Sequence, residues 1–429
     1  MKGFTPSLLA LLMLLMLGTA TVQAADDPQL AARLLHGEYL ARAGDCAACH
    51  TAPGGAPFAG GLKMTTPVGA IYSTNITPDK QTGIGEYSLQ EFSDALRKGV
   101  TRDGTRLYPA MPYPSFAKIS DEDVRDLYLY FTHQVHPVAQ QNKDSDIPWP
   151  LNMRWPLAMW DLVFREDGTY QPDATQSAEW NRGAYLVQGL GHCGSCHTPR
   201  GIGFQEKALN QSDSAYLSGG TLEGWHAANL RADAVSGLGG WNAEDITRFL
   251  KTGHNNRFAA FGSMVDVVQD STQYLSVEDL RAIAGYLQSL QADNQEKPLL
   301  QDGSTAALLA KGDVSRPGAQ AYLDNCAACH RSDGKGYRDT FPQLAHNPAL
   351  LSDDPSSLIS IVINGSRTPI TVGAPTGLTM PDFGWRLNDQ QIAELATFVR
   401  SSWGNHAPRV TAAEVQEIRK NSVSKPTHP

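Results

Sequence analysis

The stretch Cys326-Ala327-Ala328-Cys329-His330 has two counterparts in the chain, Cys46-Ala47-Ala48-Cys49-His50 and Cys193-Gly194-Ser195-Cys196-His197. The pattern C-x-x-C-H is typical of covalent attachment of a c-type haem. Its two thiols form thioether bonds with the porphyrin vinyl groups, and the following His places an imidazole under the iron. The three copies use all six cysteines of the chain. The sequence therefore predicts three covalent haem c groups, attached through Cys46, Cys49, Cys193, Cys196, Cys326 and Cys329.

Three other kinds of site also contain C-x-x-C pairs: zinc ribbons, redox disulfides and structural disulfides. A zinc ribbon needs two pairs that are close in sequence, whereas these pairs are separated by stretches of domain length. A redox disulfide does not require a His directly after each pair. Haem is therefore the favoured interpretation, with His50, His197 and His330 as axial iron ligands.

The length, charge and N-terminus limit the class of protein. A chain of 429 residues agrees with about three domains, and the net charge of -9 argues against a nucleic-acid partner. Lys2, the apolar run Leu8 to Leu17 and the small residues around Ala24 predict a secretory signal peptide over residues 1–24. An uncleaved anchor is the alternative, but the run is short for a membrane span. We expect an exported protein without a transmembrane helix.

The residues around the motifs form three sequence repeats, which we call the first, second and third modules. Upstream of each motif lies a Gly with a nearby aromatic residue, at Gly37, Gly183 and Gly318. Each module ends in a predicted amphipathic helix that starts at Ser120, Ser276 or Asn388. The same apolar face recurs in these helices: Val124, Leu127, Tyr130 and Phe131; Leu280, Ile283, Tyr286 and Leu287; Ile392, Leu395, Phe398 and Val399. We expect the upstream Gly to let this last helix cross closely.

A middle helix also repeats. It is expected to start at Ser88, at Asn242 and near Asp354 and Ser357, and to end at Gly99, Gly253 and Gly365 as left-handed C-caps.

A loop with a Met follows each middle helix. Thioether sulfur opposite His is the ligand pair of c-type cytochromes, although Met is more often a filler of apolar cores. The second and third modules each contain a single Met, and in both it lies in this loop. In the first module Met64 lies too early, and Met153 and Met159 fall in a linker. The sequence therefore predicts axial ligands at Met111, Met264 and Met380.

These features predict an all-α fold of three tandem class I-like cytochrome c domains with short linkers. The expected organisation is a signal peptide (1–24), a first domain (25–140), a Trp/Pro-rich linker (141–177), a second domain (178–297), a linker (298–313), a third domain (314–407) and a C-terminal tail (408–429).

The first linker contains an apolar stretch from Ile147 to Phe164 that includes Trp149, Trp155 and Trp160. Trp, Arg and Leu in one short run suit a membrane interface or a partner groove. A linker that folds back onto a module is the alternative, and the sequence leaves both open.

Several stretches together resemble the tri-haem cytochrome c subunits of membrane-bound bacterial dehydrogenases. They are Gly44 to Cys46, Ser73 to Asp79, Leu107 to Pro114, Asp146 to Pro150 and Phe383 to Leu387. The likeness covers nearly the whole mature chain and includes the Cys, His and Met positions named above. The linker Lys143 to Asp146 is most similar to the gluconate 2-dehydrogenase branch.

The resemblance implies an electron-transfer subunit that is not itself catalytic. Its partner would be a flavoprotein or quinoprotein dehydrogenase acting on CH–OH groups, with room for a small third subunit. The resemblance also implies peripheral attachment to the periplasmic face of the inner membrane and delivery of electrons to ubiquinone. The alternatives are the cytochrome c subunit of a quinoprotein alcohol or aldehyde dehydrogenase and a free periplasmic multi-haem shuttle. The chain has no G-x-G-x-x-G after a strand, so no flavin domain is expected in it.

Overall fold

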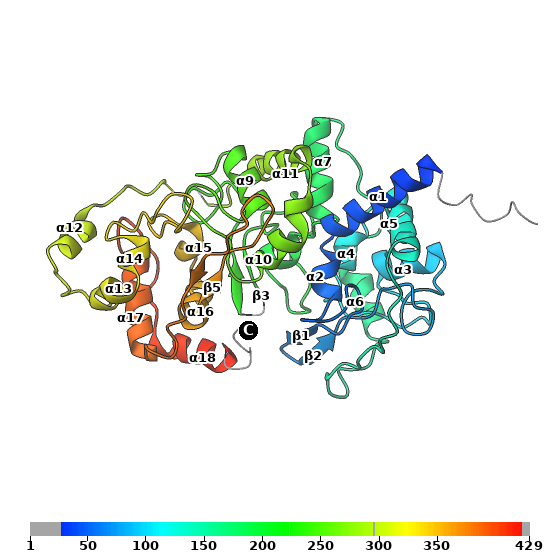
Figure 1. The fold of residues 1–429 in the computed structure, drawn as a ribbon, viewed down its shortest axis with the longest axis horizontal. Helices are drawn as coiled ribbons and strands as arrows, with labels where there is room; N and C mark the ends of the chain where they lie inside the picture. Colours follow the sequence, from blue (N-terminus) through cyan, green and yellow to red (C-terminus); the bar gives the residue numbers. More distant parts are fainter. Residues whose placement is uncertain (1–26, 223, 295–296, 423–429) are drawn as a thin grey trace, which may run out of the picture.

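The computed structural model of the protein describes residues 27–222, 224–294 and 297–422. The predicted signal peptide, residues 1–24, lies outside the described residues. Three groups of helices follow one another along the long axis of the molecule, one for each sequence module (Figure 1).

The first group ends with a helix from the predicted linker. Its elements are α1 (Pro28–Ala43), α2 (Cys46–His50), β1 (Lys63–Thr66), β2 (Gly69–Tyr72), α3 (Leu89–Lys98), α4 (Tyr113–Phe116), α5 (Asp121–His133) and α6 (Leu157–Phe164).

The second group repeats this order and adds a π-helix and a 3₁₀ turn. Its elements are α7 (Ala178–Gln188), α8 (Gly194–His197), β3 (Gly220–Leu222), β4 (Trp225–Ala227), α9 (Ala243–Thr252), α10 (Met264–Asp266), η1 (Val267–Ser271), η2 (Thr272–Tyr274) and α11 (Val277–Ser289).

The third group includes one helix on each side of the predicted third domain. Its elements are α12 (Ser304–Ala310), α13 (Ala319–Asn325), α14 (Ala327–His330), α15 (Pro348–Leu351), α16 (Ser356–Asn364), β5 (Ser366–Arg367), β6 (Thr379–Met380), α17 (Asp389–Arg400) and α18 (Ala412–Ser422).

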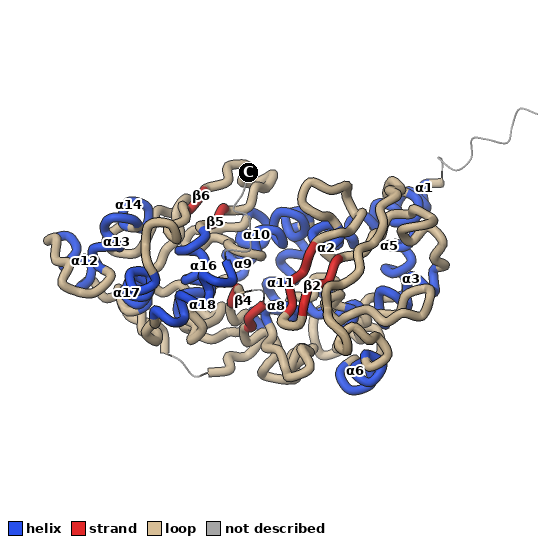
Figure 2. Tube along the Cα trace, turned by 90° about the horizontal axis from the view of Figure 1, so that it is seen from below, coloured by secondary structure: helices blue, strands red, loops and turns tan. Residues whose placement is uncertain are grey.

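The described chain is mostly helical, which confirms the coarse prediction of fold class. It also contains three antiparallel pairs of short strands, β1–β2, β3–β4 and β5–β6, drawn in red in Figure 2. An all-α description therefore leaves these pairs out. They escape sequence analysis because strands of two to four residues are too short to show a period of two.

The predicted helix ends agree closely with the structure in the first two modules. Ser120 and Ser276 cap α5 and α11, and each hydroxyl accepts a hydrogen bond from the amide three residues later. Ser88 and Asn242 form capping boxes, and Gly99 and Gly253 end α3 and α9 in the left-handed conformation. In the third module Asn388 caps α17 as predicted. The middle helix α16 differs, because its N-cap is Pro355, without a side-chain bond, and Gly365 has a positive φ but an extended ψ.

The upstream glycines lie where the first and last helices of each module cross. A Cβ on Gly37 would lie 2.2 Å from Asp126 O, one on Gly183 would lie 2.0 Å from Ala282 O, and one on Gly318 would lie 2.3 Å from Glu394 O. No side chain fits at such distances. The predicted close crossing is therefore confirmed in all three modules.

In the part of the chain that the structure describes, the buried apolar residues form two hydrophobic cores. One core is shared by the first two modules, with Leu40 and Leu127 from the first and Leu186 and Leu280 from the second. The other belongs to the third module and includes Val415 of α18, which packs against α16 and α17. Among the described residues, no helix is both long enough and apolar enough to cross a membrane.

Candidate haem sites

Each C-x-x-C-H motif forms a short helical turn directly after the first helix of its module. The turns are α2, α8 and α14. Cysteines three positions apart on a helix face the same side, so one planar group can reach both thiols. All six thiols are free of disulfide bonds.

Burial raises the pKa of the first thiol in every motif, Cys46, Cys193 and Cys326, to about 12. A redox-active C-x-x-C pair has instead a lowered cysteine pKa. The described residues also contain no group of three or more His, Cys, Asp or Glu arranged to hold a metal ion. The cysteines thus fit thioether attachment better than the zinc and redox alternatives.

The three motif histidines are oriented in the same way. Nδ1 lies 2.7 Å from Thr74 O for His50, 2.6 Å from Ala228 O for His197 and 2.8 Å from Pro342 O for His330. A backbone carbonyl accepts only, so Nδ1 carries the proton in each ring and Nε2 keeps its lone pair. This is the usual orientation of a metal-binding imidazole. The structure therefore leaves the Nε2 atoms suited to bind iron.

The surroundings of the three histidines favour the neutral form of the imidazole. Burial lowers the pKa of His50, His197 and His330, because an imidazolium loses hydration there, and the bond to the carbonyl only partly offsets this effect. A neutral imidazole is the form that ligates a metal. A backbone hydrogen bond also fixes the end of each motif. The backbone carbonyl of the motif His accepts it from the amide of Gly60, Gly219 or Gly336.

The predicted Met ligands come from other elements than the histidines. Met111 lies in a turn before α4, where its amide bonds to Tyr108 O at 3.1 Å. Met264 begins α10, and Met380 lies in β6 opposite Ser366. All three side chains are partly buried, and those of Met111 and Met380 pack against the two cores. Of the other methionines, Met64 lies in β1 and Met159 is exposed on α6.

Sequence analysis missed two features beside the motifs. The carbonyls that orient the histidines are backbone groups, which carry no sequence signal. The second feature is His192, which is partly buried: burial lowers its pKa, and its ring packs edge-on against Phe116 of the first module, with 5.5 Å between the ring centroids.

The Trp-rich linker folds back onto the first and second modules and still exposes an apolar face. Asp161 of α6 bonds to Arg106 and accepts a hydrogen bond from Tyr113 Oη at 2.8 Å, while Trp160 Nε1 donates to Gly203 O at 2.7 Å. The opposite side of α6 and the loop before it form what we call the linker surface. Its exposed residues are Trp149, Leu151, Trp155, Met159, Leu162 and Val163. The alternative of a linker that folds back is thus confirmed for one side of this stretch, while attachment through the exposed apolar side stays a prediction.

Comparison with known proteins shows which family the chain resembles. The cytochrome c family model matches residues 315–403, which include the third motif. Together with the haem-attachment turns, this match defines the protein as a c-type cytochrome. The cytochrome c subunit of gluconate 2-dehydrogenase from Pantoea cypripedii is 55% identical over 417 residues, which cover 95% of each chain.

Two further relatives are similar over almost the whole chain. The cytochrome c subunit of alcohol dehydrogenase (quinone) from Gluconobacter oxydans is 50% identical, with 95% of this chain and 86% of the relative covered. The fructose dehydrogenase cytochrome subunit of Gluconobacter japonicus is 37% identical, with 99% and 92% covered. The chain therefore belongs to the family of dehydrogenase cytochrome c subunits, which transfer electrons, and the resemblance seen in the sequence is confirmed. Its three motifs are the attachment sites of three covalent haem c groups.

Proposed function

We propose that this chain relays electrons through three haems from the catalytic subunit of a membrane-bound dehydrogenase to ubiquinone. The observation that carries the proposal is the threefold repeat of one arrangement, in which the His of a C-x-x-C-H turn has its Nδ1 bonded to a backbone carbonyl. A single carrier needs one such site. Three in one chain form a relay.

The axial ligand pairs in this proposal are His50 with Met111, His197 with Met264 and His330 with Met380. Each haem supplies one-electron exchange when bound. The chain's own residues would orient the imidazoles and offer a thioether sulfur as the second ligand of each iron, so that no position would be left for a substrate. The chain is thus a non-catalytic subunit. The proposed domain boundaries are those given by the sequence, with three class I-like domains at 25–140, 178–297 and 314–407.

The proposed partner oxidises gluconate through a flavin held in another subunit. The 55% identity to the gluconate 2-dehydrogenase subunit supports this branch over the quinone alcohol dehydrogenase branch, at 50%. The linker from Lys143 to Asp146 supports it as well.

The proposed location is the periplasmic face of the inner membrane, with the protein held peripherally. The linker surface supports this placement, because it exposes Trp149 by 77% and Leu162 by 84%. Exposed Trp beside aliphatic side chains suits the boundary between lipid headgroups and acyl chains. Figure 2 shows α6 at the edge of the molecule, where it can meet a flat surface.

Purification from solubilised membranes tests the relay. A flavoprotein is expected to co-purify in a fixed ratio, gluconate is expected to reduce all three haems, and the isolated chain is expected to show no dehydrogenase activity. If ethanol reduces the haems and gluconate does not, the quinoprotein branch replaces the gluconate branch. If the chain is recovered alone from the soluble periplasm, the free shuttle replaces the relay.

A further inference from the structure

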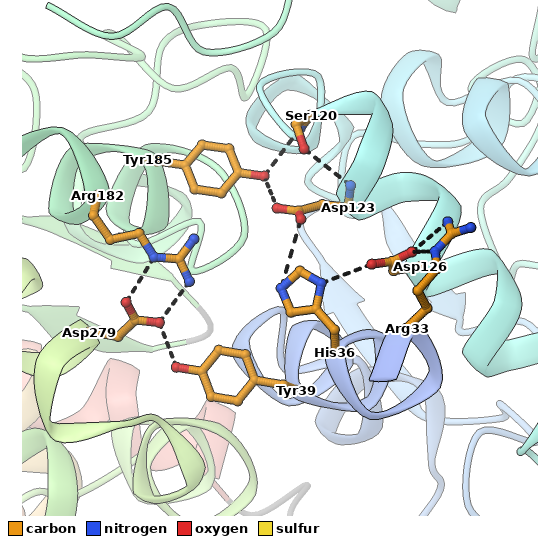
Figure 3. A network of polar contacts seen from close by, with 9 residues as sticks. All are labelled: Arg33, His36, Tyr39, Ser120, Asp123, Asp126, Arg182, Tyr185 and Asp279. Atoms are coloured by element: carbon orange, nitrogen blue, oxygen red, sulfur yellow. Dashed lines mark hydrogen bonds and ion pairs between the residues drawn. The ribbon is translucent and has the colours of Figure 1, made fainter. Parts of the chain in front are cut away.

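Two tyrosines, one from each of the first two modules, donate hydrogen bonds to the other module (Figure 3). Tyr39 of α1 donates a hydrogen bond to Asp279 Oδ2 at the start of α11, at 2.5 Å. Tyr185 of α7 donates one to Asp123 Oδ2 at the start of α5. We call these four residues the tyrosine clasp.

The two halves of the clasp are built alike. Each tyrosine hydroxyl also accepts a hydrogen bond from the backbone amide of the serine that caps the same helix, at 3.2 Å from Ser276 and 3.1 Å from Ser120. Each tyrosine lies two positions after the crossing glycine of its module, and each aspartate lies three positions after the capping serine. Such a reciprocal contact is typical of twofold symmetric dimers. The first two modules therefore pack as an internal pseudo-twofold pair.

Basic side chains flank the acceptors of the clasp. Arg182 holds Asp279 with two bonds of 2.8 and 2.7 Å. Burial opposes ionisation of Asp279, but the hydrogen bonds from Arg182 and Tyr39 outweigh it and lower the pKa of this carboxyl. On the other side His36 takes the place of Arg182, with Nδ1 2.9 Å from Asp126 and Nε2 4.0 Å from Asp123.

The clasp lies beside the two haem-attachment turns. Gly44, two residues before Cys46, packs against the second module, where a Cβ would meet Leu190 Cδ2 at 3.4 Å. The same Cβ would lie 3.5 Å from Cys46 Sγ. His192, just before Cys193, packs against Phe116 of the first module. Both motifs thus border the interface that the tyrosines hold together.

The third module lacks both halves of the clasp. Gln320 follows its crossing glycine where the other modules have Tyr, and Gln391 follows its capping Asn388 where they have Asp. Its core is also separate from the shared core of the first two modules. The tyrosine and aspartate therefore occur only in the modules that use them to pair.

We propose that Tyr39 and Tyr185 are positioning residues that fix the separation and orientation of the first two haems, so that these haems exchange electrons as a rigid pair. The inference rests on the proposed three-haem relay. It adds that the first two haems form one unit, to which the third is joined without a clasp.

The test uses the purified full-length holoprotein with Tyr39→Phe and Tyr185→Phe, singly and together. Circular dichroism in the Soret region reports the mutual orientation of neighbouring haems, and amide hydrogen exchange reports opening of the interface. The double variant is expected to keep three haems and to lose most of the signal that arises from haem–haem coupling. Exchange at the starts of α5 and α11 is expected to rise roughly tenfold or more, because each variant removes a hydrogen bond to a buried carboxylate.

The matched control is Tyr72→Phe, which removes a 2.9 Å hydrogen bond from the first module to Asp146 of the first linker, away from the second module. This control is expected to leave both signals unchanged. If the double variant matches the wild type in Soret circular dichroism and in amide exchange, the inference is overturned. If the double variant loses haem, the single variants provide the test, because each keeps one tyrosine–aspartate bond. Each single variant is then expected to show the same two effects in smaller degree, and no effect in either would overturn the inference. Because the measurements need no partner subunit, their outcome is independent of whether a dehydrogenase co-purifies.

Discussion

At the scale of single residues, the candidate sites depend on groups of two kinds. The Cys and His of each motif are adjacent in sequence, so their chemistry can be predicted from the motif alone. The carbonyls that orient the histidines lie 24, 31 and 12 residues further along the chain. Any residue type provides a carbonyl, so only the folded chain shows which one lies beside Nδ1. The Met residues are intermediate, because elimination predicts them while their approach to the iron depends on packing.

Replacement of the Met residues tests the predicted ligands one at a time. Met111→Ala, Met264→Ala and Met380→Ala are each expected to vacate one axial position, to lower the reduction potential of one haem and to create one binding site for carbon monoxide. Difference spectra of the reduced protein with carbon monoxide measure the last effect. Met64→Ala, a partly buried methionine in β1, is the control and should bind none. Stoichiometric binding of carbon monoxide by the wild type would mean that one of the assigned pairs is wrong.

At the scale of helices, local signals predicted most of what the structure contains. Capping residues located the last helix of every module, because a cap and an amphipathic face act within one or two turns. The strand pairs and α6 were missed for a different reason. The strands are too short to show a pattern, and α6, with the sequence LAMWDLVF, is apolar nearly all round, so its helical period is hidden. Its single acid, Asp161, points to the buried side, which became clear only from its bonds to Arg106 and Tyr113.

The close helix crossing predicts that Gly→Ala substitutions at two positions of the second module change the stability of the fold in opposite directions. Gly183→Ala is expected to destabilise the fold by about 1–3 kcal/mol, since its Cβ would lie 2.0 Å from Ala282 O and force α7 away from α11. Gly285→Ala is the matched control, because a Cβ at this exposed position of α11 meets nothing within 4 Å. It is expected to stabilise the protein by about 0.5–1 kcal/mol through helix propensity. Urea unfolding followed by far-ultraviolet circular dichroism measures both. Equal effects at the two positions would show that the crossing is not as close as described.

At the scale of the whole molecule, the modules are joined in two different ways. The first two share one apolar core and the tyrosine clasp. The third meets the second through polar contacts, such as Ser357 Oγ with His226 N at 2.8 Å and Gln343 N with Arg257 O at 2.6 Å. Sequence analysis predicted three modules from their repeats but not which of them pair, because a repeat does not show which surfaces meet. With the structure in hand, the unequal pairing can be traced to two positions, which hold Tyr and Asp in the first two modules and Gln in the third.

The linker surface makes a prediction about how the whole molecule is held at a membrane. The triple variant Trp149→Ser, Trp155→Ser and Leu162→Ser is expected to weaken binding to vesicles of phosphatidylethanolamine and phosphatidylglycerol roughly a hundredfold, because three apolar side chains no longer leave water. Trp160 is kept, since its bond to Gly203 O holds α6 in place. Co-sedimentation with the vesicles is the measurement, and haem content should stay unchanged.

The matched control for this prediction is Trp385→Ser. Trp385 is 79% exposed, similar to Trp149, but it lies in the third module, away from the linker surface. If attachment depends on any exposed Trp, both variants will bind vesicles more weakly. If attachment depends on the linker surface, only the triple variant will bind vesicles more weakly, since only it removes side chains from that surface. Unchanged sedimentation of the triple variant would assign attachment to the partner subunit instead.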